Sequence, residues 1–231
     1  DIAIGTMNAL NFSSMSFKRK LMDDRLNLTL NIGDPFNLSG FGFTTWGDFD
    51  DDGDEDLFTG GKLFRNDAGS FVDITTDSDL QMLGGSGGVW GDYDNDGCLD
   101  LLIFTESTTG SEAILRGDCS GHFTDVTEAT GINDLLDEQR CENDEQNRAP
   151  TAAAAWVDLD ADGFLDIYLA NFLCWSNGEA YHNHIWRSRG DGTFEEWSGM
   201  RGLDDPIPLA SRNITPVDLE QDGDMDLFIG N

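Results

Sequence analysis

The sequence has few basic residues and few histidines. Its 231 residues contain 13 lysines and arginines against 45 aspartates and glutamates, which gives a formal net charge of −32. Phosphates would repel so acidic a chain, so nucleic acid and anionic membranes are poor partners for it. Because the chain has only three histidines, no Cys/His constellation and no phosphate-cradling glycine-rich loop before a helix, we expect no enzyme.

Long apolar runs are also missing. No stretch reaches the length of a transmembrane helix, and no signal peptide is visible. The hydrophobic fraction is nevertheless 39%, and the apolar residues come in strand-sized runs. The sequence therefore predicts a folded domain and not a disordered acidic tail.

One segment, WGDFDDDGDEDLF at 46–58, concentrates the acidic residues. Seven of the nine residues from Asp48 to Asp56 are carboxylates, and such like charges repel unless a cation lies among them. Asp48, Asp50 and Asp52 alternate before Gly53, whose conformational freedom allows the chain to turn around one centre. Oxygen ligands without nitrogen or sulfur favour Ca²⁺.

The pattern occurs four times, as D-x-[DE]-x-D-G-x-x-D followed by an apolar residue. The copies begin at Asp48, Asp92, Asp158 and Asp218. An EF-hand shares this beginning, but it needs a bidentate glutamate at position 12 and helices on both sides. Position 12 here is Thr59, Ile103, Leu169 or Ile229, inside short apolar runs that predict buried strands. The EF-hand is therefore excluded.

The complete repeat is longer than the loop. A strand precedes each loop, an apolar strand follows it, and after a variable connection come two further strands joined by an Asn/Asp/Gly-rich turn, as in KLFRNDAGSFVDIT at 62–75. Four-stranded units of this kind form the blades of a β-propeller. We predict an all-β chain with three complete blades at 40–83, 84–150 and 151–209, partial blades at 1–39 and 210–231, and an acidic insertion at 131–150.

These motifs, above all LFRNDAGSFVDIT and HFTDVTEATGI, resemble the FG-GAP or VCBS repeats of integrin α-subunits and, most closely, proteins similar to cartilage acidic protein. The resemblance implies that each loop binds one Ca²⁺ between the first two strands of a blade, about four ions in all. The implied side-chain ligands are Asp48, Asp50, Asp52, Asp56, Asp92, Asp94, Asp96, Asp100, Asp158, Asp160, Asp162, Asp166, Asp218, Glu220, Asp222 and Asp226. The backbone carbonyls of Asp54, Cys98, Phe164 and Asp224 would complete the four sites.

The two ends of the sequence are in the same phase of the repeat. Residues 1–6, DIAIGT, align with residues 226–231, DLFIGN, and MSFKRKL and RLNLTLNI would be the third and fourth strands of the first partial blade. Two explanations stay open. The sequence is part of a longer chain, or neighbouring copies complete each other's blades in a fibre or ring.

The cysteines and the sequons indicate an oxidising, extracellular setting. If the hairpin of the second blade is centred between Thr108 and Thr109, Cys98 lies opposite Cys119 and can form a disulfide, which leaves Cys141 to pair with Cys174. Glycosylation sequons begin at Asn11, Asn27, Asn37 and Asn213.

We therefore predict a secreted or cell-surface, calcium-binding propeller that serves as a structural or adhesive scaffold and self-associates or binds an extracellular protein or glycan. The alternative is a carbohydrate-binding or polysaccharide-cleaving propeller. The triplets Arg116-Gly117-Asp118 and Arg189-Gly190-Asp191 are expected to be turns between the third and fourth strands, and not adhesion motifs. His182 and His184 lack a third ligand nearby and are expected to be structural.

Overall fold

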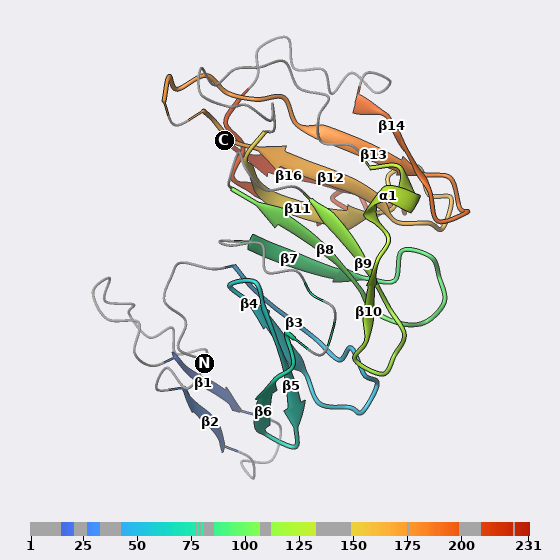
Figure 1. Ribbon diagram of the computed structural model, residues 1–231. Coiled ribbons are helices and arrows are strands. Elements are labelled where there is room, and N and C mark those ends of the chain that lie inside the picture. Colours follow the sequence, from blue (N-terminus) through green and yellow to red (C-terminus); the bar gives the residue numbers. More distant parts are fainter. Residues whose placement is uncertain are drawn as a thin grey trace. The chain divides into compact units, whose positions relative to one another are not determined.

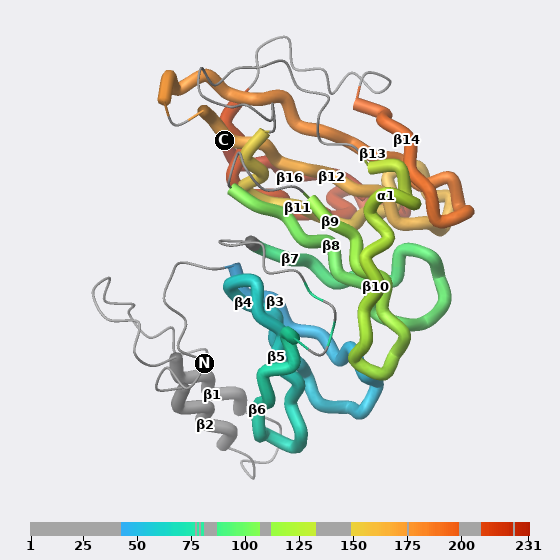
Figure 2. The backbone as a smooth tube through the Cα atoms, in the orientation of Figure 1, coloured from blue at the N-terminus to red at the C-terminus, as the bar shows by residue number. Residues whose placement is uncertain are grey.

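A computed structural model gives the fold of the chain (Figures 1 and 2). It describes residues 15–20, 27–32, 43–76, 78, 80, 86–106, 112–132, 149–174, 176–198, 209–223 and 225–231. The chain divides into two compact units, Asp1–Gly40 and Phe41–Asn231. In the first unit, β1 (Met15–Lys20) and β2 (Asn27–Ile32) form an antiparallel hairpin, which confirms the two strands predicted there.

In the second unit, the described residues form three four-stranded antiparallel sheets and one further hairpin. The first sheet contains β3 (Thr44–Gly47), β4 (Asp56–Thr59), β5 (Lys62–Asp67) and β6 (Ser70–Asp73). The second contains β7 (Ser86–Gly91), β8 (Asp100–Thr105), β9 (Ala113–Gly117) and β10 (Phe123–Asp125). The third contains β11 (Thr151–Val157), β12 (Asp166–Asn171), β13 (His184–Ser188) and β14 (Phe194–Glu196), and the hairpin is formed by β15 (Asn213–Val217) and β16 (Asp226–Gly230).

Each sheet is a meander in which consecutive strands pair, so the predicted four-strand order is confirmed (Figure 1). The second strands β4, β8 and β12 are buried along their whole length, which explains why their sequences are continuously apolar instead of alternating. A short helix that the sequence did not suggest, α1 (Thr127–Thr130), follows β10 and ends at Gly131 in the left-handed conformation. No helix within the described ranges is long and apolar enough to cross a membrane.

All four acidic loops leave their sheets at the same register. The last pairs before the loops are Gly47 with Asp56, Gly91 with Asp100, Val157 with Asp166, and Val217 with Asp226. The first and ninth loop residues therefore always flank the end of a two-stranded ladder. This shared geometry brings the alternating aspartates back toward the ladder.

Aromatic side chains connect the first and second loops with the sheet that follows each of them. Phe49, at the second loop position, packs against Trp90 of β7 at 5.9 Å and Phe123 of β10 at 5.6 Å between ring centroids. Tyr93 repeats this arrangement with Trp156 of β11 and Phe194 of β14, each at 5.9 Å. Phe49 and Tyr93 are 1% and 4% exposed, so each of these two loops is anchored in a hydrophobic contact between two sheets.

Close packing requires a small residue just before two of the loops. A Cβ atom on Gly47 would lie 2.8 Å from Cδ1 of Trp90, and one on Gly91 would lie 2.6 Å from Cδ1 of Trp156. In the third repeat the same position is Val157, and the corresponding residue of the next strand is Pro216 instead of tryptophan. The residue before the loop thus varies with the size of the side chain in the next repeat.

The loop backbone is the same in all four copies. Position 4 has a left-handed φ of 57–59° at Asp51, Asn95, Ala161 and Gln221, and the glycine at position 6 has a φ between 90° and 98°. The glycine was expected from the sequence, but the left-handed fourth residue was not. Asp and Asn tolerate this conformation, whereas Ala161 and Gln221 adopt it at a cost of about 1 kcal/mol or more.

A disulfide joins Cys98 to Cys119, which confirms the expected pairing. The register assumed for it was wrong by one residue: the observed pairs, such as Leu101 with Leu115, would place Cys98 opposite Asp118. Cys119 still reaches Cys98 because it adopts a left-handed φ of 57° in the turn between β9 and β10. Cys174 is also disulfide-bonded; its expected partner, Cys141, lies outside the described residues.

Replacing Gly91 by alanine should destabilise the protein by about 1–3 kcal/mol, because the added methyl group would overlap the indole of Trp156. Gly230→Ala is the matched control, since its new methyl group would meet only Asn213 Cβ at 3.5 Å. Urea unfolding followed by far-UV circular dichroism measures both effects. Equal stability of Gly91→Ala and wild type would contradict the packing argument.

Replacing Ala161 by asparagine should stabilise the protein by about 0.5–1 kcal/mol, because asparagine adopts left-handed φ values more readily than alanine. The reciprocal change, Asn95→Ala, should destabilise it, and it also removes the hydrogen bond from Asn95 Nδ2 to the carbonyl of Gly163. Both changes are measured by urea unfolding. A loss of stability in Ala161→Asn would contradict this account.

Candidate metal centres

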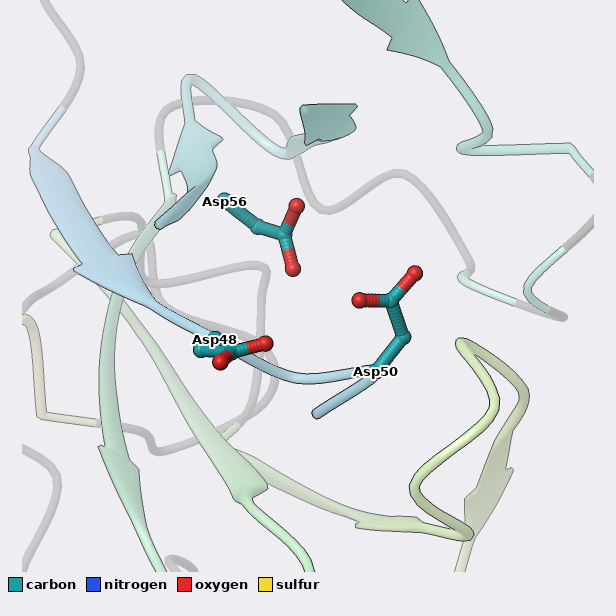
Figure 3. Close-up of side chains that lie close together, drawn as sticks. All are labelled: Asp48, Asp50 and Asp56. Atoms are coloured by element: carbon teal, nitrogen blue, oxygen red, sulfur yellow. The ribbon is translucent and has the colours of Figure 1, made fainter. Parts of the chain in front are cut away.

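Three of the four loops gather carboxylates into a compact group. The groups are Asp48, Asp50 and Asp56; Asp92, Asp94 and Asp96; and Asp158, Asp160 and Asp166, and in each group one oxygen per residue lies within 4.8 Å of the others. Figure 3 shows the first group, in which the carboxylates of Asp48, Asp50 and Asp56 turn toward a common space at the end of β3 and the start of β4. The fold thus brings the predicted ligands at positions 1, 3 and 9 of the first and third loops, and those at positions 1, 3 and 5 of the second, close to one another.

The first aspartate of each loop holds the turn. Asp48 accepts hydrogen bonds from the backbone N–H groups of Asp52 at 3.1 Å and Gly53 at 2.9 Å. Asp92, Asp158 and Asp218 accept the same two bonds from positions 5 and 6 of their own loops, at 2.9–3.2 Å. A carboxylate oxygen can accept more than one bond, so this role leaves lone pairs free for a cation.

The ninth aspartate is the most buried acid of each complete repeat. Asp56, Asp100 and Asp166 are 0% exposed. In each, one oxygen accepts the N–H of the second loop residue and the other accepts an N–H from the third strand. The donors are Phe49 and Asn66 for Asp56, Tyr93 and Gly117 for Asp100, and Leu159 and Ser188 for Asp166, at 2.7–3.1 Å.

Burial dominates the electrostatics of this residue. It raises the pKa of Asp56 and of Asp166 to about 6 and that of Asp100 to about 7, although the backbone hydrogen bonds act in the opposite direction. The neighbouring loop carboxylates raise these pKa values further. Without a bound cation, ionisation of the ninth aspartate is therefore energetically unfavourable compared with an exposed aspartate.

The residue at loop position 3 has an unpaired carboxylate oxygen in the first and third loops, within the described part of the chain. Oδ1 of Asp50 and Oδ1 of Asp160 are buried and have no hydrogen-bond partner among the described residues. A buried, unpaired carboxylate oxygen is costly in a protein interior. A cation at the centre of each group would satisfy it, so the residues fit a hard divalent ion such as Ca²⁺.

The seventh residue has a role that the sequence did not reveal. Its side chain contacts a left-handed residue in the turn between the third and fourth strands, and it does so by a different chemistry in each repeat. Asp54 Oδ2 accepts the N–H of Ala68 at 2.9 Å, Cys98 is disulfide-bonded to Cys119, and the ring of Phe164 packs on Gly190. The backbone carbonyl of this residue stays a predicted ligand.

Two arginines near the loops were also missed. Arg187 of β13 forms ion pairs with Asp160 and, at 3.3 Å, with Asp162, while Arg65 of β5 has Nε 4.0 Å from Oδ2 of Asp50. The signal was present in the sequence, because arginine recurs at the same place in the third strand, at Arg65, Arg116 and Arg187.

The remaining predicted residues are placed as follows. In the fourth loop, Asp226 Oδ2 accepts the N–H of Leu219 at 3.0 Å, as the equivalent residues do, and Asp224 lies outside the described residues. Asn213 begins β15 and is exposed, Asn27 begins β2, and Asn11 and Asn37 lie outside the described residues.

The two RGD triplets do not occupy equivalent places. Arg116 aligns with Arg65 in the third strand, whereas Arg189 comes two residues after Arg187, the residue equivalent to Arg65. In the second triplet, Asp191 accepts hydrogen bonds from the backbone and the hydroxyl group of Thr193. This bonding is typical of a turn residue.

Comparisons with known proteins agree with the repeat structure. A search of curated proteins found no match. A solved structure of a lectin from Agrocybe aegerita, described as recognising non-reducing terminal N-acetylglucosamine, aligns with 83% of this chain at 16% identity and a TM-score of 0.45. The chain spans about half of that lectin, 47% of its length. The FG-GAP-like repeat family model matches residues 158–229, from the first aspartate of the third loop to β16, so this part of the chain is similar to the repeats of that family.

Proposed function

We propose that the chain is a calcium-stabilised β-propeller segment that serves as an extracellular structural or adhesive scaffold. The observation that carries this proposal is the threefold recurrence of carboxylate oxygens within 4.8 Å of one another. One such group is common on protein surfaces. Three groups at the same register of successive sheets, each tied to its sheet by a buried ninth aspartate, are better explained by a bound ion.

The residues that would hold the ions are the first, third, fifth and ninth of each loop. Ca²⁺ would supply positive charge and accept the oxygens without directional demands. The chain itself does the rest: the first aspartate fixes the turn, the ninth connects the loop to the third strand, and in the first two loops an aromatic second residue packs on the next sheet. A rigid loop therefore means a fixed relation between consecutive sheets.

An extracellular location is supported by two features. The disulfide between Cys98 and Cys119 forms and persists in oxidising compartments. Loops of this type bind calcium most usefully where the ion is at millimolar concentration, as it is outside cells. Attached glycans and self-assembly into a fibre stay predictions, as do the alternatives of carbohydrate binding and cleavage.

Removing calcium should lower the melting temperature of the protein markedly. An ion at one hundred times its Kd contributes about 2.7 kcal/mol per site, and several sites act together. We expect calorimetric titration of the metal-stripped protein to show three or four calcium sites, and excess chelator to cause a fall of well over ten degrees in melting temperature.

The matched variants are Asp94→Asn, which removes one charge from the second carboxylate group, and Glu128→Gln, which removes one charge from the exposed helix α1. Only Asp94→Asn should lose a calcium site. A protein that melts at the same temperature with calcium and with chelator would refute the proposed function.

The stability of the metal-stripped protein should rise as the pH falls from 8 to 5.5. Burial raises the pKa of Asp100 to about 7 and those of Asp56 and Asp166 to about 6. The folded state therefore takes up protons that the unfolded state does not, and the corresponding stability is lost as the pH rises through 6 to 7. Because protons compete with calcium, the stabilisation by added calcium should shrink over the same range. Urea unfolding at both pH values, with and without calcium, measures this; a metal-stripped protein that is less stable at pH 5.5 would contradict it.

A further inference from the structure

Arginines of two third strands contact loop carboxylates, and the role proposed for them rests on the proposed calcium function. We propose that Arg187 is a positioning residue for the third metal centre: it holds Asp160 by the outer carboxylate oxygen and leaves the inner oxygen directed at the ion. Arg65 does the same, more weakly, for Asp50.

The two oxygens of Asp160 have different surroundings. Nε and Nη2 of Arg187 both contact Oδ2 of Asp160, whereas Oδ1 is buried without a partner in the described part of the chain. The side chain of Asp160 is 10% exposed, so Oδ1 cannot rely on bulk water. The arginine therefore fixes the orientation of the carboxylate through one oxygen and keeps the other available for a cation.

The first loop shows the same division. Nε of Arg65 lies 4.0 Å from Oδ2 of Asp50, and Oδ1 of Asp50 is the unpaired oxygen. The longer distance and the competing contact of Arg65 with Asp67 at 2.8 Å indicate a weaker restraint. Two independent repeats thus place an arginine on Oδ2 and leave Oδ1 free.

The second loop supplies a natural comparison. Arg116 is exposed and forms no ion pair within the described residues. In this loop the carboxylate group contains the fifth residue, Asp96, whereas in the loops contacted by arginine it contains the ninth residue, Asp56 or Asp166. In the third loop, Asp162 accepts the N–H of Phe164 on Oδ1 and contacts Arg187 with Oδ2. The two loops in which an arginine contacts the third residue thus have the ninth aspartate in their carboxylate group, whereas the loop without such a contact has the fifth.

Arg187 itself is held from outside the loop. Its Nη1 lies 3.8 Å from Oε1 of Glu195, and its guanidinium carbon lies 5.4 Å from the centroid of the Trp197 ring. Because β14 and the residue that follows it thus support Arg187, this arginine is positioned to restrain Asp160 without depending on the metal.

Simple electrostatics and positioning make opposite predictions. Removing a positive charge next to a calcium site should tighten calcium binding if charge alone matters. If Arg187 positions Asp160, Arg187→Gln should weaken binding at the third loop by roughly tenfold or more, as losses of supporting residues around metal ligands commonly do. Arg187→Lys, which keeps the charge but not the planar fork, should recover only part of the affinity.

The test is a calcium titration followed by ¹⁵N NMR of the uniformly labelled chain. The amides of Gly53, Gly97 and Gly163 each donate to the first aspartate of their own loop and therefore report separate Kd values. Arg189→Gln is the matched control, because it removes the same charge only two residues further along the chain, where Nη2 of Arg189 contacts Oε2 of Glu195. Its Kd at Gly163 should be unchanged or lower.

The expected result is a weaker site at Gly163 in Arg187→Gln, with the Gly97 site unaffected and the Arg187 Nε–H signal retained when calcium is added to wild type. An unchanged or tighter Gly163 site in Arg187→Gln, in a protein whose wild type responds to calcium, would overturn this inference and leave the proposed function standing. If none of the three glycine amides of the wild type responds to calcium, the proposed function fails and the inference fails with it.

Discussion

The buried carboxylate of the ninth loop residue is the contact on which each repeat depends. Asp56 connects three parts of its repeat at once, because it begins β4, accepts the N–H of Phe49 in the loop and accepts the N–H of Asn66 in β5. Its complete burial makes the ionised form expensive, which the raised pKa of about 6 expresses. The loop sequence therefore carries both a structural demand for this carboxylate and an electrostatic demand for positive charge beside it.

Positive charge reaches the loops unevenly from within the chain. Arg187 makes direct ion pairs with two loop carboxylates, Arg65 approaches one, and Arg116 forms no ion pair in the described part of the chain. One guanidinium cannot neutralise a group of three or more carboxylates, and thirteen basic residues cannot compensate for forty-five acidic ones. The arginines are better suited to orient ligands than to replace an ion, because they contact outer oxygens and leave buried inner oxygens unpaired.

Much of the fold could be predicted from the sequence because the same pattern of strands and acidic loop recurs four times. The strands on both sides of each loop, the four-strand order and the pairing of Cys98 with Cys119 followed from periodicity and spacing. The register around that disulfide did not, because a single left-handed residue, Cys119, shifts the facing position by one. Helix α1 was missed since four residues carry too little periodic signal.

The candidate site was predictable in its composition but not in its geometry. Alternating aspartates identified the loop, yet they could not show which carboxylates lie close together, because the group contains the ninth residue in two loops and the fifth in another. Nor could they show that Asp54, Cys98 and Phe164 serve the same contact, since a hydrogen bond, a disulfide and an aromatic ring share no residue type. Only the position of the left-handed turn residue, at Ala68, Cys119 and Gly190, makes the equivalence visible.

Successive loops are also physically continuous. Tyr93, the second residue of one loop, stacks on Trp156, which lies two residues before the first aspartate of the next, and Asn95 Nδ2 donates to the carbonyl of Gly163 in that next loop at 3.1 Å. An ion bound at the second loop would therefore also restrain the strand and the turn from which the third loop is built. Because each restraint would act on a neighbour, the order imposed by the proposed cations would extend from one sheet to the next.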